Sequence, residues 1–171
     1  MTMVKLYVQP SVASVPGFFF ETIEEYRGKI FRLWFVPAVN VGELEIKFID
    51  GKDIDREVFE ALDVNKDNIG EYLRVVKQIG FRDKVKLIIR TKVMIYSGGS
   101  WEEAKEWDIE VYELDSLKDL AIHMVKEGFY GEVSERLEPY IDYAKLSHHL
   151  SMDYTEITIA GKNYVYFYSY C

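Results

Sequence analysis

The sequence predicts an α+β fold, with small antiparallel sheets and packed helices in an elongated chain of two or three parts. Segments of alternating apolar and polar residues, typical of half-buried strands, occur near both ends of the chain. Segments with apolar residues three and four positions apart, typical of amphipathic helices, lie between them. With 171 residues, of which 49% are hydrophobic and 15% aromatic, the chain can form one domain or two or three very small ones.

An N-terminal α+β domain is expected over residues 1–61. Val4–Gln9 alternates and predicts a first strand, and the apolar run Ile30–Val36 predicts a second, buried one. Glu43–Ile49 alternates again and predicts a third strand. Because three strands alone bury little apolar surface, we expect other elements to cover this sheet.

A divergent middle part is expected over residues 62–104. The spacing of apolar residues predicts a helix over Asp55–Leu62, which leads into this part, and another over Asn68–Ile79 within it. Lys84–Tyr96 then alternates basic and apolar residues, which predicts a long strand, and Ser97–Ser100 predicts the turn that follows it.

The predicted strand is expected to form a long hairpin with the acidic segment Lys105–Leu114. In one interpretation, acidic residues such as Glu106, Asp108 and Glu110 lie opposite the basic ones and neutralise them through cross-strand pairs. In the other, the basic face is exposed and binds nucleic acid, although it lacks the interleaved aromatic residues that stack on bases. The basic face contains Lys84, Lys86, Arg90 and Lys92.

A C-terminal α+β domain is expected over residues 105–171. Asp115–Asp119 supplies a cap and an acidic first turn, which predicts the start of a helix that Gly128 ends. Asp142 is expected to cap a second helix. That helix is expected over Tyr143–Met152, and a hairpin about Gly161 over Tyr154–Ile159 and Tyr164–Tyr168.

The residues that carry most enzyme chemistry are scarce. Cys171 is the one cysteine, which excludes a disulfide scaffold and a thiolate zinc site. His123, His148 and His149 have neither metal-binding spacing nor a nucleophile to pair with. Adjacent helical residues point about 100° apart, so we expect one of the two neighbouring histidines to be packed and the other exposed. We expect no enzyme, no metal and no cofactor.

The N-terminal segment lacks a signal-peptide pattern, and no apolar run approaches membrane-spanning length. We therefore expect a cytoplasmic protein that does not bind a membrane.

The formal net charge of -8 is unevenly distributed. Residues 1–92 contain 15 basic and 14 acidic residues, whereas residues 93–171 contain 6 basic and 15 acidic ones. An acidic surface often reflects solubility alone, but this asymmetry also favours a basic partner for the second half.

Several stretches of the second half resemble one protein family. They are Asp115–Ala121, Glu127–Tyr143, the helix that contains His149-Leu150, and the hairpin that begins at Asp153. Together they resemble the C-terminal domain of ArdA-type antirestriction proteins, over roughly residues 107–169. The most specific part is Gly131-Glu132-Val133, followed by Leu137 and by Tyr140-Ile141-Asp142-Tyr143, which is similar to the antirestriction motif of that family.

A weaker resemblance to the same family lies near the N-terminus. There Tyr26-Arg27-Gly28 leads to Trp34-Phe35-Val36-Pro37, similar to a segment of the family's first domain. Residues 62–100 depart from the family, whose middle domain is acidic and helical.

The resemblance implies an anti-defence protein of a mobile genetic element that acts as an acidic DNA mimic. It implies that the chain occludes the DNA-binding groove of a type I restriction-modification methyltransferase, or of another DNA-binding defence protein, without binding nucleic acid itself. Such a groove is lined with Lys and Arg, and its affinity is mostly electrostatic.

Acidic residues of the second half are the candidate mimic surface. Carboxylates four apart on a helix are displaced about 6 Å along its axis, so Asp115 and Asp119 would imitate successive phosphates. The expected surface contains Asp115, Asp119, Glu127, Glu132, Glu135, Glu138, Asp142, Asp153 and Glu156.

The resemblance also implies a homodimer, because the motif region of the family lies at its dimer contact. The apolar interface would contain Phe129, Leu137, Tyr140, Ile141 and Tyr143. The alternative is that these side chains belong to an ordinary core.

Two further functions stay open at this point. One is inhibition of a different nucleic-acid-binding defence enzyme, such as a CRISPR nuclease, which the neutral first half favours. The other is a nucleic-acid-binding regulator that uses the basic strand over residues 84–92.

Overall fold

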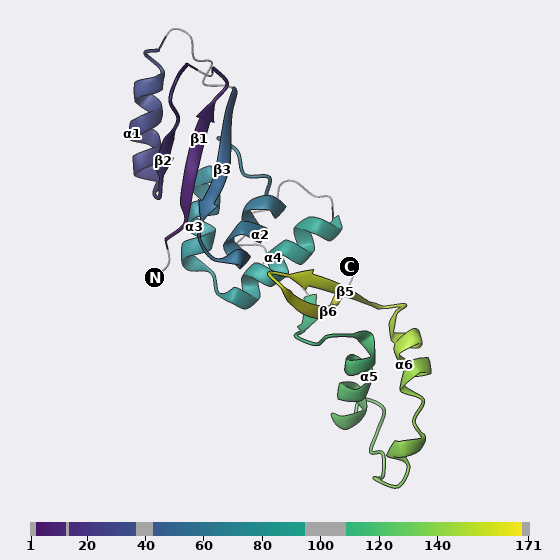
Figure 1. Cartoon of the computed structure of the whole chain (residues 1–171). Helices are drawn as coiled ribbons and strands as arrows, with labels where there is room; N and C mark the ends of the chain where they lie inside the picture. The colour runs from purple at the N-terminus through teal and green to yellow at the C-terminus, as the bar shows by residue number, and fades with distance from the viewer. Residues whose placement is uncertain (1–2, 13, 37–42, 95–108, 169–171) are drawn as a thin grey trace. The chain divides into compact units, whose positions relative to one another are not determined.

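The computed structural model describes residues 3–12, 14–36, 43–94 and 109–168. The chain divides into two compact units, Met1–Lys105 and Glu106–Cys171, each of which is described by itself. Each unit contains a three-stranded antiparallel sheet and helices (Figure 1). The predicted α+β fold class is therefore confirmed.

The sheet of the first unit has the strand order β2-β1-β3. β1 spans Lys5–Pro10, β2 spans Phe18–Phe20 and β3 spans Leu44–Asp50. The alternation in β1 buries Leu6 and Val8 on one face, and Phe20 pairs with Leu6 on that same face. The predictions for the first and third strands are confirmed.

The prediction of a strand over Ile30–Val36 is wrong. This segment contains the end of helix α1, which spans Ile23–Leu33, and β2 is the third strand of the sheet in its place. The helix buries Tyr26 and Leu33, seven positions apart, which is two helical turns. In Figure 1, α1 runs beside β2.

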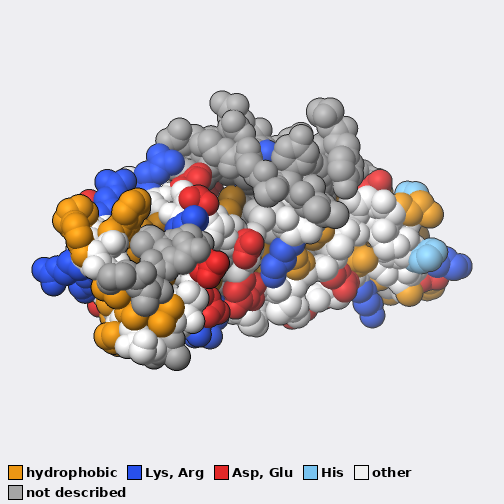
Figure 2. Space-filling view, turned by 90° about the horizontal axis from the view of Figure 1, so that it is seen from above, with side chains coloured by type: hydrophobic (Ala, Val, Ile, Leu, Met, Phe, Trp, Pro, Cys, Tyr) orange, Lys and Arg blue, Asp and Glu red, His pale blue; other side chains and the backbone are white. Residues whose placement is uncertain are grey.

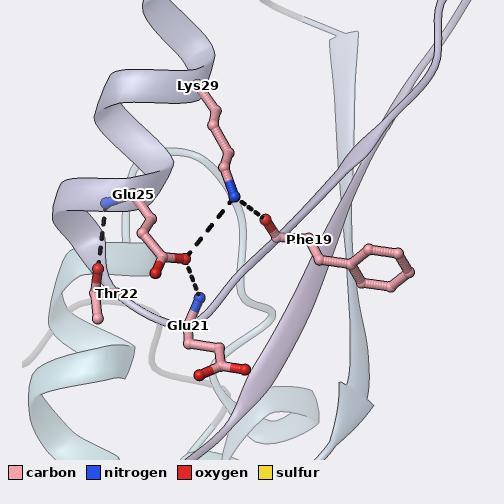
Figure 3. A network of polar contacts seen from close by, with 5 residues as sticks. All are labelled: Phe19, Glu21, Thr22, Glu25 and Lys29. Atoms are coloured by element: carbon pink, nitrogen blue, oxygen red, sulfur yellow. Dashed lines mark hydrogen bonds and ion pairs between the residues drawn. The ribbon is translucent and has the colours of Figure 1, made fainter.

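The start of α1 explains why this segment becomes a helix. The Thr22 side chain accepts a hydrogen bond from the backbone N–H of Glu25 at 3.2 Å, and the Glu25 carboxylate accepts one from the backbone N–H of Glu21 at 3.1 Å (Figure 3). The Lys29 ammonium donates to the carbonyl of Phe19 at 2.7 Å, which ties the helix to β2. Capping of this kind satisfies backbone donors that the first helical turn leaves unpaired.

The structure confirms the next two helices that the sequence predicts. α2 spans Asp53–Ala61 and α3 spans Ile69–Gln78. An edge-to-face contact between Phe59 of α2 and Tyr72 of α3, with ring centroids 5.4 Å apart, and a contact between Phe59 and Phe48 of β3 join the two helices to the sheet.

The prediction of a long basic strand over Lys84–Tyr96 is also wrong. Helix α4 spans Phe81–Met94, and it packs against α2. Val85, Ile88 and Ile89 are buried at helical spacing. Ile88 interrupts the alternation of basic and apolar residues that is typical of a strand. Its position in the sequence therefore indicated a helix. The Ser97–Ser100 turn lies outside the described residues.

The basic residues of this segment therefore do not form one face of a strand. Lys84 is buried, and its Nζ lies 2.6 Å from Oδ1 of Asp55 on α2. Lys92 lies 2.9 Å from the carboxylate of Glu57 on the same helix. Two of the four cations thus stabilise the packing of α4 on α2, which removes the basis for a nucleic-acid-binding strand.

The sheet of the second unit has the strand order β4-β6-β5. β4 spans Ile109–Tyr112, β5 spans Tyr154–Ile159 and β6 spans Lys162–Tyr168. β5 and β6 form the predicted hairpin about Gly161, where φ is 74°. β4 pairs with β6, so the predicted hairpin between Lys84–Tyr96 and Lys105–Leu114 is wrong.

Two helices cover one face of this sheet. α5 spans Leu117–Lys126 and α6 spans Tyr143–Leu150, and they lie side by side (Figure 1). Both predicted helices are confirmed, as is the end of α5 at Gly128, where φ is 78°. The core of the unit consists of Leu120, Ala121, Met124, Leu150 and Val165. The structure shows no helix, among the residues it describes, that is long and apolar enough to cross a bilayer.

Candidate functional site

The candidate site is the segment that connects α5 to α6, together with the acidic residues of the second unit. Gly128 and Gly131 both have positive φ, of 78° and 88°, a conformation that favours glycine. Backbone hydrogen bonds within the segment include Gly131 N–H to Gly128 C=O at 2.9 Å and Leu137 N–H to Ser134 C=O at 2.8 Å. A short 3₁₀ helix, η3, follows at Glu138–Tyr140. Local turns therefore shape this segment, which we call the motif loop and define as residues 127–142.

The motif loop presents large apolar side chains to solvent. Tyr140 is 83% exposed, Phe129 64% and Leu137 60%. Tyr130 is also exposed, although its hydroxyl lies 3.9 Å from the sulfur of Met124. Exposed apolar side chains on one loop are candidates for an interaction surface. Tyr130 was not among the interface residues predicted from the sequence.

Two other residues predicted for the interface lie differently. Ile141 is half-buried. Tyr143 is also half-buried and packs against the core of α5, α6 and β6. Its hydroxyl is buried and has no hydrogen-bond partner among the described residues. The structure therefore places three predicted interface residues on the surface and Tyr143 against the core of its own unit.

Four of the nine nominated acidic residues form hydrogen bonds within the second unit. The Asp119 carboxylate accepts a bond from the hydroxyl of Ser116, the residue that caps α5. The Glu156 carboxylate accepts one from the backbone N–H of Leu117 at 2.7 Å. These bonds stabilise the start of α5, where a negative charge is also favoured by the helix dipole. Asp115 accepts a longer bond, of 3.4 Å, from the Asn163 side chain.

Asp142 is the fourth of these acidic residues and caps α6 as predicted. Its carboxylate accepts a hydrogen bond from the backbone N–H of Lys145 at 3.0 Å, and the Lys145 ammonium lies 3.5 Å away. The backbone hydrogen bond from Lys145 is the main reason why the pKa of Asp142 lies below its ordinary value.

The pairing of Asp115 with Asp119 as successive phosphate mimics is not supported by the geometry. α5 begins at Leu117, with Ser116 as its cap, so Asp115 precedes the helix. The helical displacement expected for residues four apart does not apply to this pair.

The other five nominated carboxylates make no hydrogen bond or ion pair to any residue that the structure describes. We call them the open acids. Four are exposed and Glu138 is half-buried. They are Glu127, Glu132, Glu135, Glu138 and Asp153, and the first four belong to the motif loop. Carboxylates without an internal partner remain available to a basic surface.

No group of three potential metal ligands occurs among the described residues. His123 makes a ring contact with Tyr112, with centroids 5.7 Å apart. His148 and His149 are both exposed. The expectation that one of them is packed is therefore wrong. Histidine side chains, coloured pale blue, are visible at the surface in Figure 2. Cys171 lies outside the described residues.

A second exposed cluster, which was not predicted from the sequence, lies at the end of α1. Phe31, Trp34 and Phe35 are all exposed, and the rings of Phe31 and Phe35 meet edge to face at 5.1 Å. Hydrophobic side chains and Lys or Arg side chains gather at the left of Figure 2, over the first unit. Phe31, Trp34 and Phe35 have helical spacing, which the prediction of a strand over this segment did not take into account.

A scan against protein-family models found no match, and a search of curated proteins found none either.

Proposed function

We propose that this protein is an inhibitor of a DNA-binding defence enzyme, and that it acts as an acidic DNA mimic through its second unit. The target we propose is the methyltransferase of a type I restriction-modification complex. The proposal takes the target class from the resemblance of residues 107–169 to ArdA-type proteins. The observation that carries it is the set of five open acids, four of them on the motif loop.

Charge balance supports the same function. From Glu113 to the C-terminus the chain contains ten acidic and five basic residues. Two of the five cations are paired with acids of the same unit, Lys145 with Asp142 and Lys162 with Glu113. The open acids would meet the Lys and Arg side chains of a DNA-binding groove and replace the phosphates there.

We also propose that the protein acts as a homodimer through the motif loop. Phe129, Leu137 and Tyr140 would be removed from water in such an interface, and aromatic residues are enriched at the centre of interfaces. Dimer formation would place two sets of open acids on one assembly, which suits a long groove.

The test of DNA mimicry is a competition experiment. Purified protein is titrated into a type I methyltransferase bound to labelled DNA, and the bound fraction is measured by fluorescence anisotropy. We expect stoichiometric displacement of the DNA. If no excess of the protein displaces DNA, the proposed target is wrong.

The role of the open acids is tested with the triple variant Glu132→Gln, Glu135→Gln, Glu138→Gln. At ~0.5 kcal/mol for each exposed ion pair, we expect inhibition to weaken about tenfold, with a smaller salt dependence. The matched control, Glu24→Gln, Glu43→Gln, Glu60→Gln, removes three exposed carboxylates of the first unit and should leave inhibition unchanged. Equal losses for both triple variants would contradict a specific role for the second unit.

The proposed dimer is tested by sedimentation velocity. Leu137→Ser with Tyr140→Ser should shift the protein toward monomer, whereas Met152→Ser, which changes another exposed apolar residue of the same unit, should not. A monomeric wild-type protein at all concentrations would rule out the homodimer but leave the mimic proposal standing.

A further inference from the structure

The first unit contains a cavity that the proposed function does not use. Its volume is about 490 Å³, and it is lined by residues just before β1, from the β2–α1 junction and from α2, α3 and α4. Small-molecule sites commonly have volumes of about 300–1,000 Å³. Most of the wall is apolar and includes Ile54, Leu73, Val76, Ile79 and Phe81. The size and the lining suit a small ligand with an apolar body.

One charged side chain in this wall has an N–H donor without an acceptor among the described residues. Lys84 is buried and lines the cavity. Its ammonium group has three N–H donors, and two of them bond to Oδ1 of Asp55 at 2.6 Å and to the carbonyl of Val76 at 2.9 Å. No third acceptor is found among the described residues. A ligand oxygen in the cavity would satisfy this donor, which is costly to leave unpaired in a buried position.

The other charges around the cavity favour an anion. Lys52 and Lys77 line it, are exposed and make no ion pair with any residue that the structure describes. Glu21 is one of two acidic residues in the lining. The second is Asp55, and Lys84 already neutralises it. The balance of the lining is therefore positive.

We propose that this cavity binds a small amphiphilic carboxylate. The carboxylate accepts the third N–H of Lys84, while Lys52 and Lys77 add electrostatic attraction at the mouth. The hydrocarbon body lies against Leu73, Ile79 and the neighbouring apolar residues. A single negative charge fits better than a doubly charged phosphate, because one spare donor cannot offset the loss of hydration of two charges. The inference concerns the first unit and does not depend on DNA mimicry.

The experiment uses the full chain and three probes of equal chain length: octanoate, octanol and octylammonium. Binding is followed by titration in two-dimensional NMR spectra, which also locate the site. We expect octanoate to shift the amide signals of residues around Ile54, Val76 and Ile79, with an affinity about tenfold higher than that of octanol, because a charge-assisted hydrogen bond is stronger than the neutral one that octanol would form. Octylammonium should not bind.

Three variants then test the contacts. The double variant Asp55→Asn, Lys84→Met removes the buried pair together, so that no unpaired charge remains, and should lose the preference for octanoate over octanol. Lys52→Gln with Lys77→Gln should weaken octanoate binding severalfold. Leu73→Trp keeps every charge, fills the cavity and should abolish binding of both probes; its folding is verified by its NMR spectrum.

Several results would overturn the inference. They are an absence of octanoate binding at millimolar concentration, equal affinities for octanoate and octanol, or unchanged octanoate binding by the double variant or by Leu73→Trp. Octanoate-induced shifts confined to Phe31, Trp34 and Phe35 would also overturn it, because binding would then occur at the exposed cluster on α1.

Discussion

Lys84 and Asp55 form an ion pair whose two side chains are almost completely buried. Removing one partner from such a pair leaves a buried charge without compensation. We expect Lys84→Met to lower the free energy of unfolding of the first unit by about 3–5 kcal/mol. The double variant Asp55→Asn, Lys84→Met should recover most of this loss, because it leaves no buried charge without compensation.

Urea denaturation monitored by circular dichroism measures these changes. Lys92→Met is the matched control, because its ion pair with Glu57 is partly exposed and should contribute less than about 1 kcal/mol. A similar loss in Lys84→Met and Lys92→Met would contradict the importance of burial.

Tyr154 makes the second unit sensitive to alkaline pH. Burial of the hydroxyl, and then the negative charge of Glu110, raise its pKa to about 12. The unfolded chain releases this proton near pH 10, its ordinary value, while the folded chain still holds it. The stabilisation from Tyr154 is thus complete below about pH 10 and is lost as the pH rises toward the folded pKa.

We expect the Tyr154→Phe variant to show a smaller decrease in stability between about pH 10 and 12 than the wild type. The measurement is urea denaturation across this pH range. Tyr7→Phe, in the first unit, is the matched control. If Tyr154→Phe and the wild type lose stability in parallel, another group is responsible for the alkaline sensitivity.

At the scale of single elements, the N-cap of α5 contributes to the stability of the second unit. The Ser116 hydroxyl accepts a bond from the backbone N–H of Asp119 at 3.2 Å and donates to its carboxylate. We expect Ser116→Ala to destabilise the second unit by about 1 kcal/mol, the usual cost of losing such a cap. Thermal unfolding measures the loss. Ser134→Ala, at an exposed position in the motif loop, should change the midpoint little.

Most of the helices and strands could be predicted from the sequence alone. β1, β3, α2, α3, α5, α6 and the β5–β6 hairpin were all predictable, because each has a clear period and most have a turn or cap residue at one end. α1 and α4 were not recognised. The end of α1 is an apolar run rich in aromatic residues, and α4 contains apolar residues at alternate positions; both patterns favour a strand in isolation. Tertiary packing of Tyr26 and Leu33, and of Val85 and Ile88, selects the helix.

The sequence contains a helix signal for both α1 and α4. Thr22 followed three residues later by Glu25 is a capping-box pattern, and it predicts the start of α1. In α4, the adjacent Ile88 and Ile89 follow Val85 by three and four positions, which is helical spacing. The pairing of Lys84 with Asp55, 29 positions apart, could not be predicted, since it depends on how α4 packs on α2.

The candidate site was predictable only in part. Sequence position identified the acidic and apolar residues of the motif loop, but not which of them have partners. Asp119 and Glu156 were nominated for an outside partner, yet both bond to the start of α5. The Glu156 bond depends on how β5 lies against the start of α5, which no local pattern encodes, whereas the Ser116–Asp119 bond joins residues three apart and follows a local capping pattern.

At the scale of the whole molecule, the charge asymmetry predicts how the protein behaves toward DNA itself. An acidic mimic should repel DNA, so we expect no mobility shift of duplex or single-stranded DNA even at low salt. A shift would favour a nucleic-acid-binding function instead. Repeating the assay with Arg27→Ala and Arg32→Ala, two exposed cations beside the aromatic cluster of α1, would then show whether α1 is responsible.

The division of the acidic residues into bonded and open ones also has an evolutionary consequence. Asp119, Asp142 and Glu156 hold helix ends in place, so any selection for a folded protein will preserve them. Glu132 and Glu135 form no hydrogen bond or ion pair with the residues of the unit that the structure describes, so we expect only selection for the activity of the protein to preserve them. A library of variants sorted first for solubility and then for protection of incoming DNA should therefore conserve the first set in both rounds and the second set in the last round alone.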